Sequence, residues 1–404
     1  MKKHNIIAMA LTSLMALPVI AQDSTPAVGD ILQGINMFTP EEGDPAYKVK
    51  ANEKYGTQWG VDMAYGLWNT EKVSDVKRHN NLALLHAQLN QRLIEDKANG
   101  GTWLRVEFSG SWGLDRESAQ SDTFFTEAYA TASGLHADAM GPHEGIFPEV
   151  ALMQYFAGKR ACLIAGMVNL TNYFDAVSIA NDSFSSFTND GFVNSTILPL
   201  VDSNIGGILQ VELNRNNYMM VAVSRTGCDS GYNPFNSDYC DGYAVVGEYG
   251  HIFADGAATL RINPFYTSTD VDMDDGTGER RQNAGLVASI EYTPCDPLTI
   301  YSRAGFAAKQ YLSNSAEFSA GANIKLFPSR EDDFLGISYG VFKGQTPCDG
   351  ERAEHNREQV LEVMYSFQVN DYFKVVPHFQ YIANPAYSTS SENILWGVQA
   401  VFSF

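Results

Sequence analysis

The chain has 404 residues, a formal net charge of −20 and only 18% charged residues, and it contains 20 Tyr and 23 Phe. This acidic balance argues against nucleic acid as a partner and against binding anionic lipid through a basic patch. Beyond the N-terminal region, no run of about 18 uncharged apolar residues is present, which excludes helical membrane spans.

The chain begins with a secretory pattern. Met1–Asn5 is short and basic, Ile6–Ile20 is apolar, and small residues suit cleavage after Ala21. An uncleaved anchor is disfavoured because the apolar run is short and interrupted by Pro18. We therefore expect a signal peptide over residues 1–21, a periplasmic extension over 22–56 and a β-domain over 57–404.

The β-domain is a succession of runs that alternate with period two, the pattern of strands with two different faces. About sixteen such runs are found: Thr57–Asn69, Leu82–Ile94, Thr102–Gly113, Glu149–Phe156, Ala161–Tyr173, Ile205–Leu213, Tyr218–Arg225, Tyr243–Phe253, Ala258–Thr267, Asn283–Tyr292, Leu298–Lys309, Glu317–Leu326, Phe334–Lys343, Gln359–Gln368, Tyr372–Ile382 and Asn393–Phe404. The fold class that this pattern predicts is all-β, an antiparallel up-and-down barrel with both ends on one side.

Connections between these runs alternate between short turns and long polar loops. The long loops cover residues 114–147, 175–204, 226–241, 270–281, 344–357 and 385–392. Transmembrane barrels of the bacterial outer membrane have this asymmetry, with short periplasmic turns and long extracellular loops.

The last run ends the chain on an aromatic residue. Phe404, Phe402, Val398 and Trp396 share one face, and the other face is smaller and more polar. A soluble sandwich would bury the apolar face, whereas a barrel in lipid turns it outward and leaves a polar lumen. A terminal aromatic strand favours the barrel and predicts that the assembly machinery of the outer membrane recognises this strand.

Five cysteines are present in this exported chain. Cys228 and Cys240 are close enough in sequence to predict a disulfide across one loop. The pairing of Cys162, Cys295 and Cys348 stays open. No second metal-type cluster accompanies the pair, so we expect no metal and no cofactor.

Several stretches resemble the carbohydrate-selective porin family of the glucose-porin type. They are residues 153–156, 165–175, 180–182, 202–209, 358–367 and 379–385. The resemblance implies a sixteen-stranded barrel that admits monosaccharides and related sugars by diffusion through a weak binding site. Asn169, Asn172 and His378 depart from the family pattern, in which acidic residues are expected.

Candidate site residues lie on inward strand positions and in the loop 175–204, which we expect to fold into the barrel. A sugar constriction needs charged pairs, hydroxyl-matching groups and an aromatic face, and an Arg on the lipid face near the bilayer midplane costs about 2–4 kcal/mol, which favours inward placement. The predicted pore-lining residues are Arg105, Glu107, Asp175, Asn181, Asp182, Asn194, Arg225, Arg261, Asn263, Arg303, His378 and Gln380. An ordinary surface loop and purely structural ion pairs are the alternatives.

The leading functional hypothesis is a passive outer-membrane porin for small neutral sugars, acting as a monomer or homotrimer in contact with outer-membrane lipid. A general diffusion porin, a barrel-embedded hydrolase and a plugged structural barrel are the competing hypotheses. No His-Glu-x-x-His motif occurs and no spacing singles out a pair of carboxylates, so we expect no enzyme activity.

Overall fold

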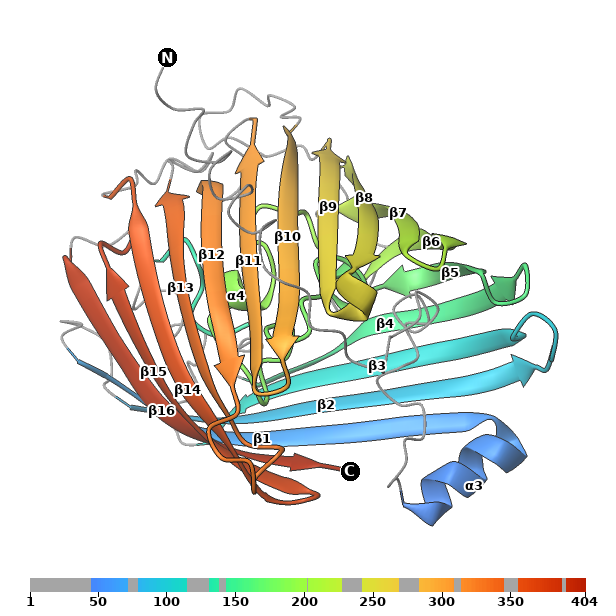
Figure 1. Cartoon of the computed structure of the whole chain (residues 1–404), viewed down its shortest axis with the longest axis horizontal. Coiled ribbons are helices and arrows are strands. Elements are labelled where there is room, and N and C mark those ends of the chain that lie inside the picture. The colour runs from blue at the N-terminus through green and yellow to red at the C-terminus, as the bar shows by residue number, and fades with distance from the viewer. Residues whose placement is uncertain are drawn as a thin grey trace.

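The computed structural model describes residues 45–71, 79–114, 131–137, 143–201, 203–226, 242–268, 283–308, 314–344, 355–386 and 390–404. Sixteen antiparallel strands in these ranges form one closed barrel in which each strand pairs with its sequence neighbours and β1 pairs with β16 (Figure 1). The strands are β1 (Thr57–Glu71), β2 (His79–Ile94), β3 (Thr102–Gly113), β4 (His143–Phe156), β5 (Ala161–Val168), β6 (Asn204–Asn214), β7 (Asn217–Thr226), β8 (Gly242–Phe253), β9 (Ala258–Thr267), β10 (Asn283–Cys295), β11 (Leu298–Ala307), β12 (Asn314–Ile324), β13 (Phe334–Gly344), β14 (Glu358–Asn370), β15 (Phe373–Ala383) and β16 (Glu392–Ser403).

The barrel closes where the first and last strands meet. Asp62 lies opposite Ser403, and the register runs without a break to Glu71 opposite Ile394. Val61 and Phe404 exchange backbone hydrogen bonds of 3.1 and 2.9 Å. Closure leaves no unpaired edge, which a barrel in a membrane requires.

The sixteen predicted strands are confirmed, several with bounds that shift by one to three residues, and two bounds shift by more. β4 begins at His143 rather than Glu149 because Pro148 lies at a bulge where the pairing of β3 with β4 shifts register, and a proline inside a run hides a strand from pattern analysis. β5 ends at Val168 rather than Tyr173, and a short 3₁₀ helix, η4 (Leu170–Asn172), follows.

Strand alternation sorts side chains between the two faces of the wall. Leu67, Leu163, Met219, Phe306 and Phe379 are exposed on the outer face, as expected for contact with hydrocarbon. Inward positions carry mainly polar side chains, and the predicted inward facing of His378 and Gln380 on β15 is confirmed by their burial.

Arg225 was predicted to face the lumen, and this prediction is wrong. It shares the outer face of β7 with Met219, Val221 and Val223, one residue from the strand's end. At that height a long basic side chain reaches the polar boundary of the bilayer, so the cost that favours inward arginines near the midplane does not apply.

The barrel interior is less polar than the sequence predicted. Two buried apolar clusters lie inside it, one including Phe174, Leu170 and Ile197, the other including Phe187 and Phe192. All five side chains come from the segment between β5 and β6 and are completely buried. The segment is therefore packed against the inner wall by apolar contacts as well as polar ones.

The helix α3 (Ala46–Tyr55) leads into β1 at the end of the molecule where the short turns lie (Figure 1). Among the described residues, no helix has the length and hydropathy needed to cross a membrane. The predicted signal peptide, most of the extension 22–56 and the predicted Cys228–Cys240 disulfide lie outside the described residues. Cys162 and Cys295 are free thiols, the first buried and the second exposed.

Tight packing at the closing seam generates a testable prediction. A Cβ added at Gly397 of β16 would lie 2.5 Å from the ring of Trp68 and 2.6 Å from the carbonyl oxygen of Leu67. Gly397→Val should therefore destabilise the folded barrel by about 1–3 kcal/mol, seen as a lower temperature of conversion to the unfolded band on heat-modifiability gels. Ala400→Val, on the outer face of the same strand, should leave that temperature unchanged, and an equal shift in both variants would contradict the packing argument.

Candidate functional site: a loop held inside the barrel by wall carboxylates

The segment between β5 and β6, residues 169–203, folds into the barrel rather than away from it. It contains η4 and one helical turn, α4 (Asp190–Val193), which lies within the ring of strands (Figure 1). Asn169 and Asn189 start these two short helices by accepting hydrogen bonds from the backbone N–H groups of Thr171 and Gly191. We call residues 169–203 the inner loop.

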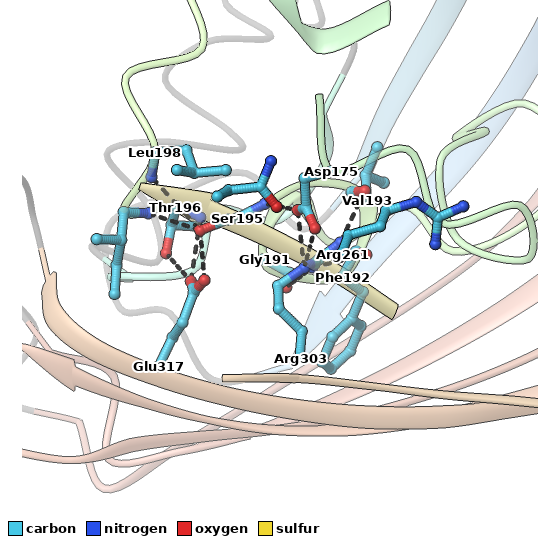
Figure 2. A network of polar contacts seen from close by, with 12 residues as sticks. Asp175, Gly191, Phe192, Val193, Ser195, Thr196, Leu198, Arg261, Arg303 and Glu317 are labelled. Atoms are coloured by element: carbon cyan, nitrogen blue, oxygen red, sulfur yellow. Dashed lines mark hydrogen bonds and ion pairs between the residues drawn. The ribbon is translucent and has the colours of Figure 1, made fainter. Parts of the chain in front are cut away.

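An arginine on the wall holds the middle of the inner loop. The guanidinium of Arg303, on β11, forms an ion pair with Asp175 at 2.8 Å (Figure 2). The same group donates hydrogen bonds to the carbonyl oxygens of Gly191, Phe192 and Val193 at 3.2–3.4 Å. One buried cation therefore joins the start of the loop to the C-terminal end of α4, where a positive charge is favourable.

Two glutamates on neighbouring parts of the wall accept hydrogen bonds from the second half of the inner loop. Glu317, on β12, accepts from the backbone N–H of Thr196 at 3.1 Å and from the hydroxyls of Ser195 and Thr196 (Figure 2). Glu362, on β14, accepts from the N–H groups of Thr188 and Asn189 at 2.9 and 3.0 Å. Each carboxylate thus satisfies loop donors that would otherwise lack partners inside the barrel.

The first half of the inner loop is held in the same way by glutamates on β8 and β10, on the other side of β11. Glu248, on β8, accepts from the N–H of Asp175 at 3.0 Å and from the amide of Asn263 at 2.7 Å. Glu291, on β10, accepts from the N–H of Ser178 at 3.0 Å and lies 3.6 Å from Arg261.

A third group of contacts fixes the start of the loop. Glu149 accepts hydrogen bonds from Arg105 at 2.9 Å and from the Tyr173 hydroxyl at 2.6 Å. Glu107 accepts from the amide nitrogens of Asn172 and Asn169 at 2.7 and 3.4 Å. Amides at these two loop positions donate to a carboxylate, whereas acids there would repel it.

A second segment, residues 131–137, also enters the barrel, although the sequence predicted only a polar surface loop over 114–147. Glu358, on β14, accepts from the N–H groups of Ala132 and Ser133 at 2.7 and 3.0 Å. His136 packs edge-on against Trp68 with ring centroids 5.3 Å apart. Burial lowers the pKa of His136 to about 3, so this ring is neutral at neutral pH.

The carboxylates that hold these segments form one set, which we call the wall glutamates. They are Glu107, Glu149, Glu248, Glu291, Glu317, Glu358 and Glu362. Sequence reasoning found only Glu107. The other six could have been noticed because each occupies an inward alternation position in its strand, opposite in phase to the apolar outer face.

Few polar groups of the inner loop stay exposed. Ser178 and Asp182 are exposed, Asn181 and Phe184 are half-buried, and His86 of β2 faces Phe184 with ring centroids 6.4 Å apart. These side chains form a mixed surface of a hydroxyl, an amide, a carboxylate and two rings.

Comparison with known proteins identifies the chain. Residues 204–404 match the family described as carbohydrate-selective porin, OprB family. The chain belongs to this family. The porin is accordingly an integral protein of the outer membrane, and its family and fold are those of a channel. The match begins at Asn204, after the inner loop.

Individual relatives are distant in sequence. An uncharacterized protein of Aquifex aeolicus (strain VF5) is 24% identical over 234 residues, 57% of the porin and 63% of that relative, so less than two-thirds of the relative's length is spanned. The high-pH structure of Pseudomonas putida OprB has a TM-score of 0.70 at 14% identity, covering 89% of the porin and 96% of that chain. A mutant of Rh. blastica porin has a TM-score of 0.51 at 11% identity, covering 86% and 100%. These structures share the barrel fold.

Most predicted pore-lining residues of the porin lie inside the barrel but support the inner loop. Arg105, Arg303, Asn263 and Gln380 are buried and bonded to the wall glutamates, to the inner loop or to the segment 131–137. Glu107, Asp175, Arg261 and His378 are likewise buried and paired. Of the predicted loop residues, Asp182 is exposed and Asn181 and Asn194 are half-buried.

The buried Arg303–Asp175 pair gives the sharpest test of this arrangement. Arg303→Met leaves the Asp175 carboxylate buried without its cation, which costs about 3–5 kcal/mol, and it removes the group that binds the C-terminal end of α4. We expect the inner loop of the porin to loosen and single-channel conductance in planar bilayers to rise and become noisy. Arg330→Met breaks a pair with Asp333 on a short turn and serves as the matched control. Unchanged conductance in Arg303→Met would contradict the anchoring role.

Proposed function

We propose that this porin lets small neutral sugars diffuse passively across the outer membrane, with the inner loop as its constriction. The observation that carries the proposal is the inner loop held within the barrel by charged hydrogen bonds from the wall. A segment that is fixed by hydrogen bonds narrows the lumen. Because it is held in one position, it presents the same surface to each passing solute.

The exposed surface of the inner loop suits a sugar. Ser178, Asn181 and Asp182 offer donors and acceptors for hydroxyl groups, and Phe184 offers an aromatic face for the apolar face of a pyranose ring. Asp182 already accepts hydrogen bonds from the N–H groups of Phe184 and Ser185 at 3.0 and 3.3 Å, which orients the turn that carries the ring. Weak contacts of this kind let a solute bind and leave again.

The hydrolase alternative finds little support in the wall carboxylates. Glu107 and Glu149 lie opposite each other in the register of β3 and β4 and form a pair of carboxylates. Both are buried and accept hydrogen bonds from several donors of the wall and inner loop. Carboxylates occupied in this way are poorly placed to act on a solute, so we propose no catalytic role for them.

We propose two kinds of protein partner, the outer-membrane assembly machinery and further copies of this chain. The aromatic strand β16, together with Phe404, which follows it and stacks on Tyr372, is proposed as the signal for the outer-membrane assembly machinery. The oligomeric state is proposed as a monomer or a homotrimer, and chemical cross-linking of the porin in its native membrane distinguishes the two.

Liposome swelling tests the proposed activity. Vesicles that contain the porin should swell faster in isotonic glucose than in amino acids or organic acids of similar size. Equal rates for all solutes of one size would indicate a general pore, and no swelling would indicate a plugged barrel.

The proposed sugar surface predicts a specific mutant effect. Phe184→Ala removes the aromatic face and the ring contact with His86 but none of the hydrogen bonds to the wall glutamates. Half-saturating glucose for block of ion current should therefore rise about 3- to 10-fold, as expected for loss of about 1 kcal/mol of ring contact. Conductance without sugar should change little. Phe306→Ala, which truncates an exposed ring on the outer face, is the matched control. Equal glucose block in the wild type and Phe184→Ala would contradict the assignment.

A further inference from the structure

The helix that precedes the barrel is basic, in contrast to the chain as a whole. α3 contains Lys48, Lys50 and Lys54 but one acid, Glu53, while the whole chain has a net charge of −20. None of its residues is buried. Tyr47, Lys50 and Lys54 follow one another at spacings of three and four residues, which places them on one exposed stripe of the helix.

The helix is held firmly against the barrel. Gly56 ends α3 with a left-handed φ of 65°, and a Cβ there would lie 2.5 Å from Arg92, so a residue with a side chain could not make the same junction. The carbonyl oxygens of Tyr55 and Gly56 accept hydrogen bonds from Gln91 and Arg92 of β2 at 2.9 and 2.8 Å. The basic stripe therefore has a fixed place relative to the wall.

That place is at the lipid-facing side of the wall. Trp59 belongs to the outer face of β1, in phase with the exposed Met63 and Leu67. The ring of Tyr47 stacks on Trp59 with centroids 6.1 Å apart, and the ammonium of Lys48 lies 4.9 Å from the Trp59 ring centroid. Since outward rings near a strand end mark the boundary between hydrocarbon and water, the helix lies where phospholipid headgroups begin.

We propose that α3 binds the headgroups of anionic phospholipids through Lys50 and Lys54, with Tyr47 and Tyr55 at the membrane interface. Ammonium groups attract phosphates electrostatically, each lysine near an anionic surface adding a factor of about five in affinity. Tyrosine suits this depth because its ring is apolar and its hydroxyl is wet. The net negative charge of the chain argued against such a partner. Salt screens interactions between charges more than about 10 Å apart, so distant acidic residues do not cancel the local positive charge of α3.

Native mass spectrometry of the full porin in detergent, titrated with phosphatidylglycerol, tests the proposal. Lys50→Gln combined with Lys54→Gln should weaken binding of phosphatidylglycerol by roughly 10- to 30-fold. Lys159→Gln combined with Lys325→Gln is the matched control, since it removes two exposed lysines from other short turns on the same side of the barrel. It should change binding by less than about twofold, and wild-type porin should bind zwitterionic phosphatidylcholine as weakly as the Lys50 and Lys54 double variant binds phosphatidylglycerol.

Three results would each overturn the proposal. Equal affinity of the two double variants for phosphatidylglycerol would show that α3 is not the site. Equal affinity of the wild type for phosphatidylglycerol and phosphatidylcholine would show that the negative charge of the headgroup does not contribute to binding. Displacement of phosphatidylglycerol by inorganic phosphate at equal concentration would show a site for free anions rather than for a lipid surface.

Discussion

A backbone N–H that is buried inside a protein needs an acceptor, and here carboxylates of the barrel wall accept several N–H groups of the inner loop. An isolated carboxylate inside a protein is unfavourable, but one that accepts several N–H and O–H bonds is stabilised by all of them. Glu362 illustrates this, since it accepts from the N–H groups of Thr188 and Asn189 and from the Thr188 hydroxyl. The position of the inner loop depends on this exchange between wall charges and loop donors.

Because many charged residues inside the barrel are bonded to the inner loop or to one another, their side chains do not face the open part of the lumen. Arg303 is completely buried between Asp175 and the end of α4, and Arg105 is buried against Glu149. Arg303 binds carbonyl oxygens of the inner loop, and Arg105 pairs with Glu149, which accepts a hydrogen bond from the Tyr173 hydroxyl. Apolar anchors act in parallel, because Phe187 and Phe192 each remove a large ring from water when the loop lies inside.

The fold was predictable because strand facing has a strict period of two, which the sequence displays from Thr57 to Phe404. The site was less predictable because that period tells which residues point inward but not what they meet there. Arg105 and Arg303 were correctly placed inside, yet their partners lie in segments far away in sequence. Arg225 was misplaced because its height in the bilayer, rather than its residue type, decides the cost of facing outward. No local sequence pattern predicts that residues 131–137 enter the barrel, because their contacts are with Glu358 and Trp68 on strands far away in sequence.

Amide hydrogen exchange of the wild-type porin in lipid measures the central claim directly. The N–H groups of Asp175, Thr188, Asn189 and Thr196 are each bonded to a wall glutamate, so they should exchange as slowly as the N–H groups of the strands. Exchange of these four amides at the rate of a solvated surface loop would show that the carboxylates do not hold the inner loop, and the account would fail.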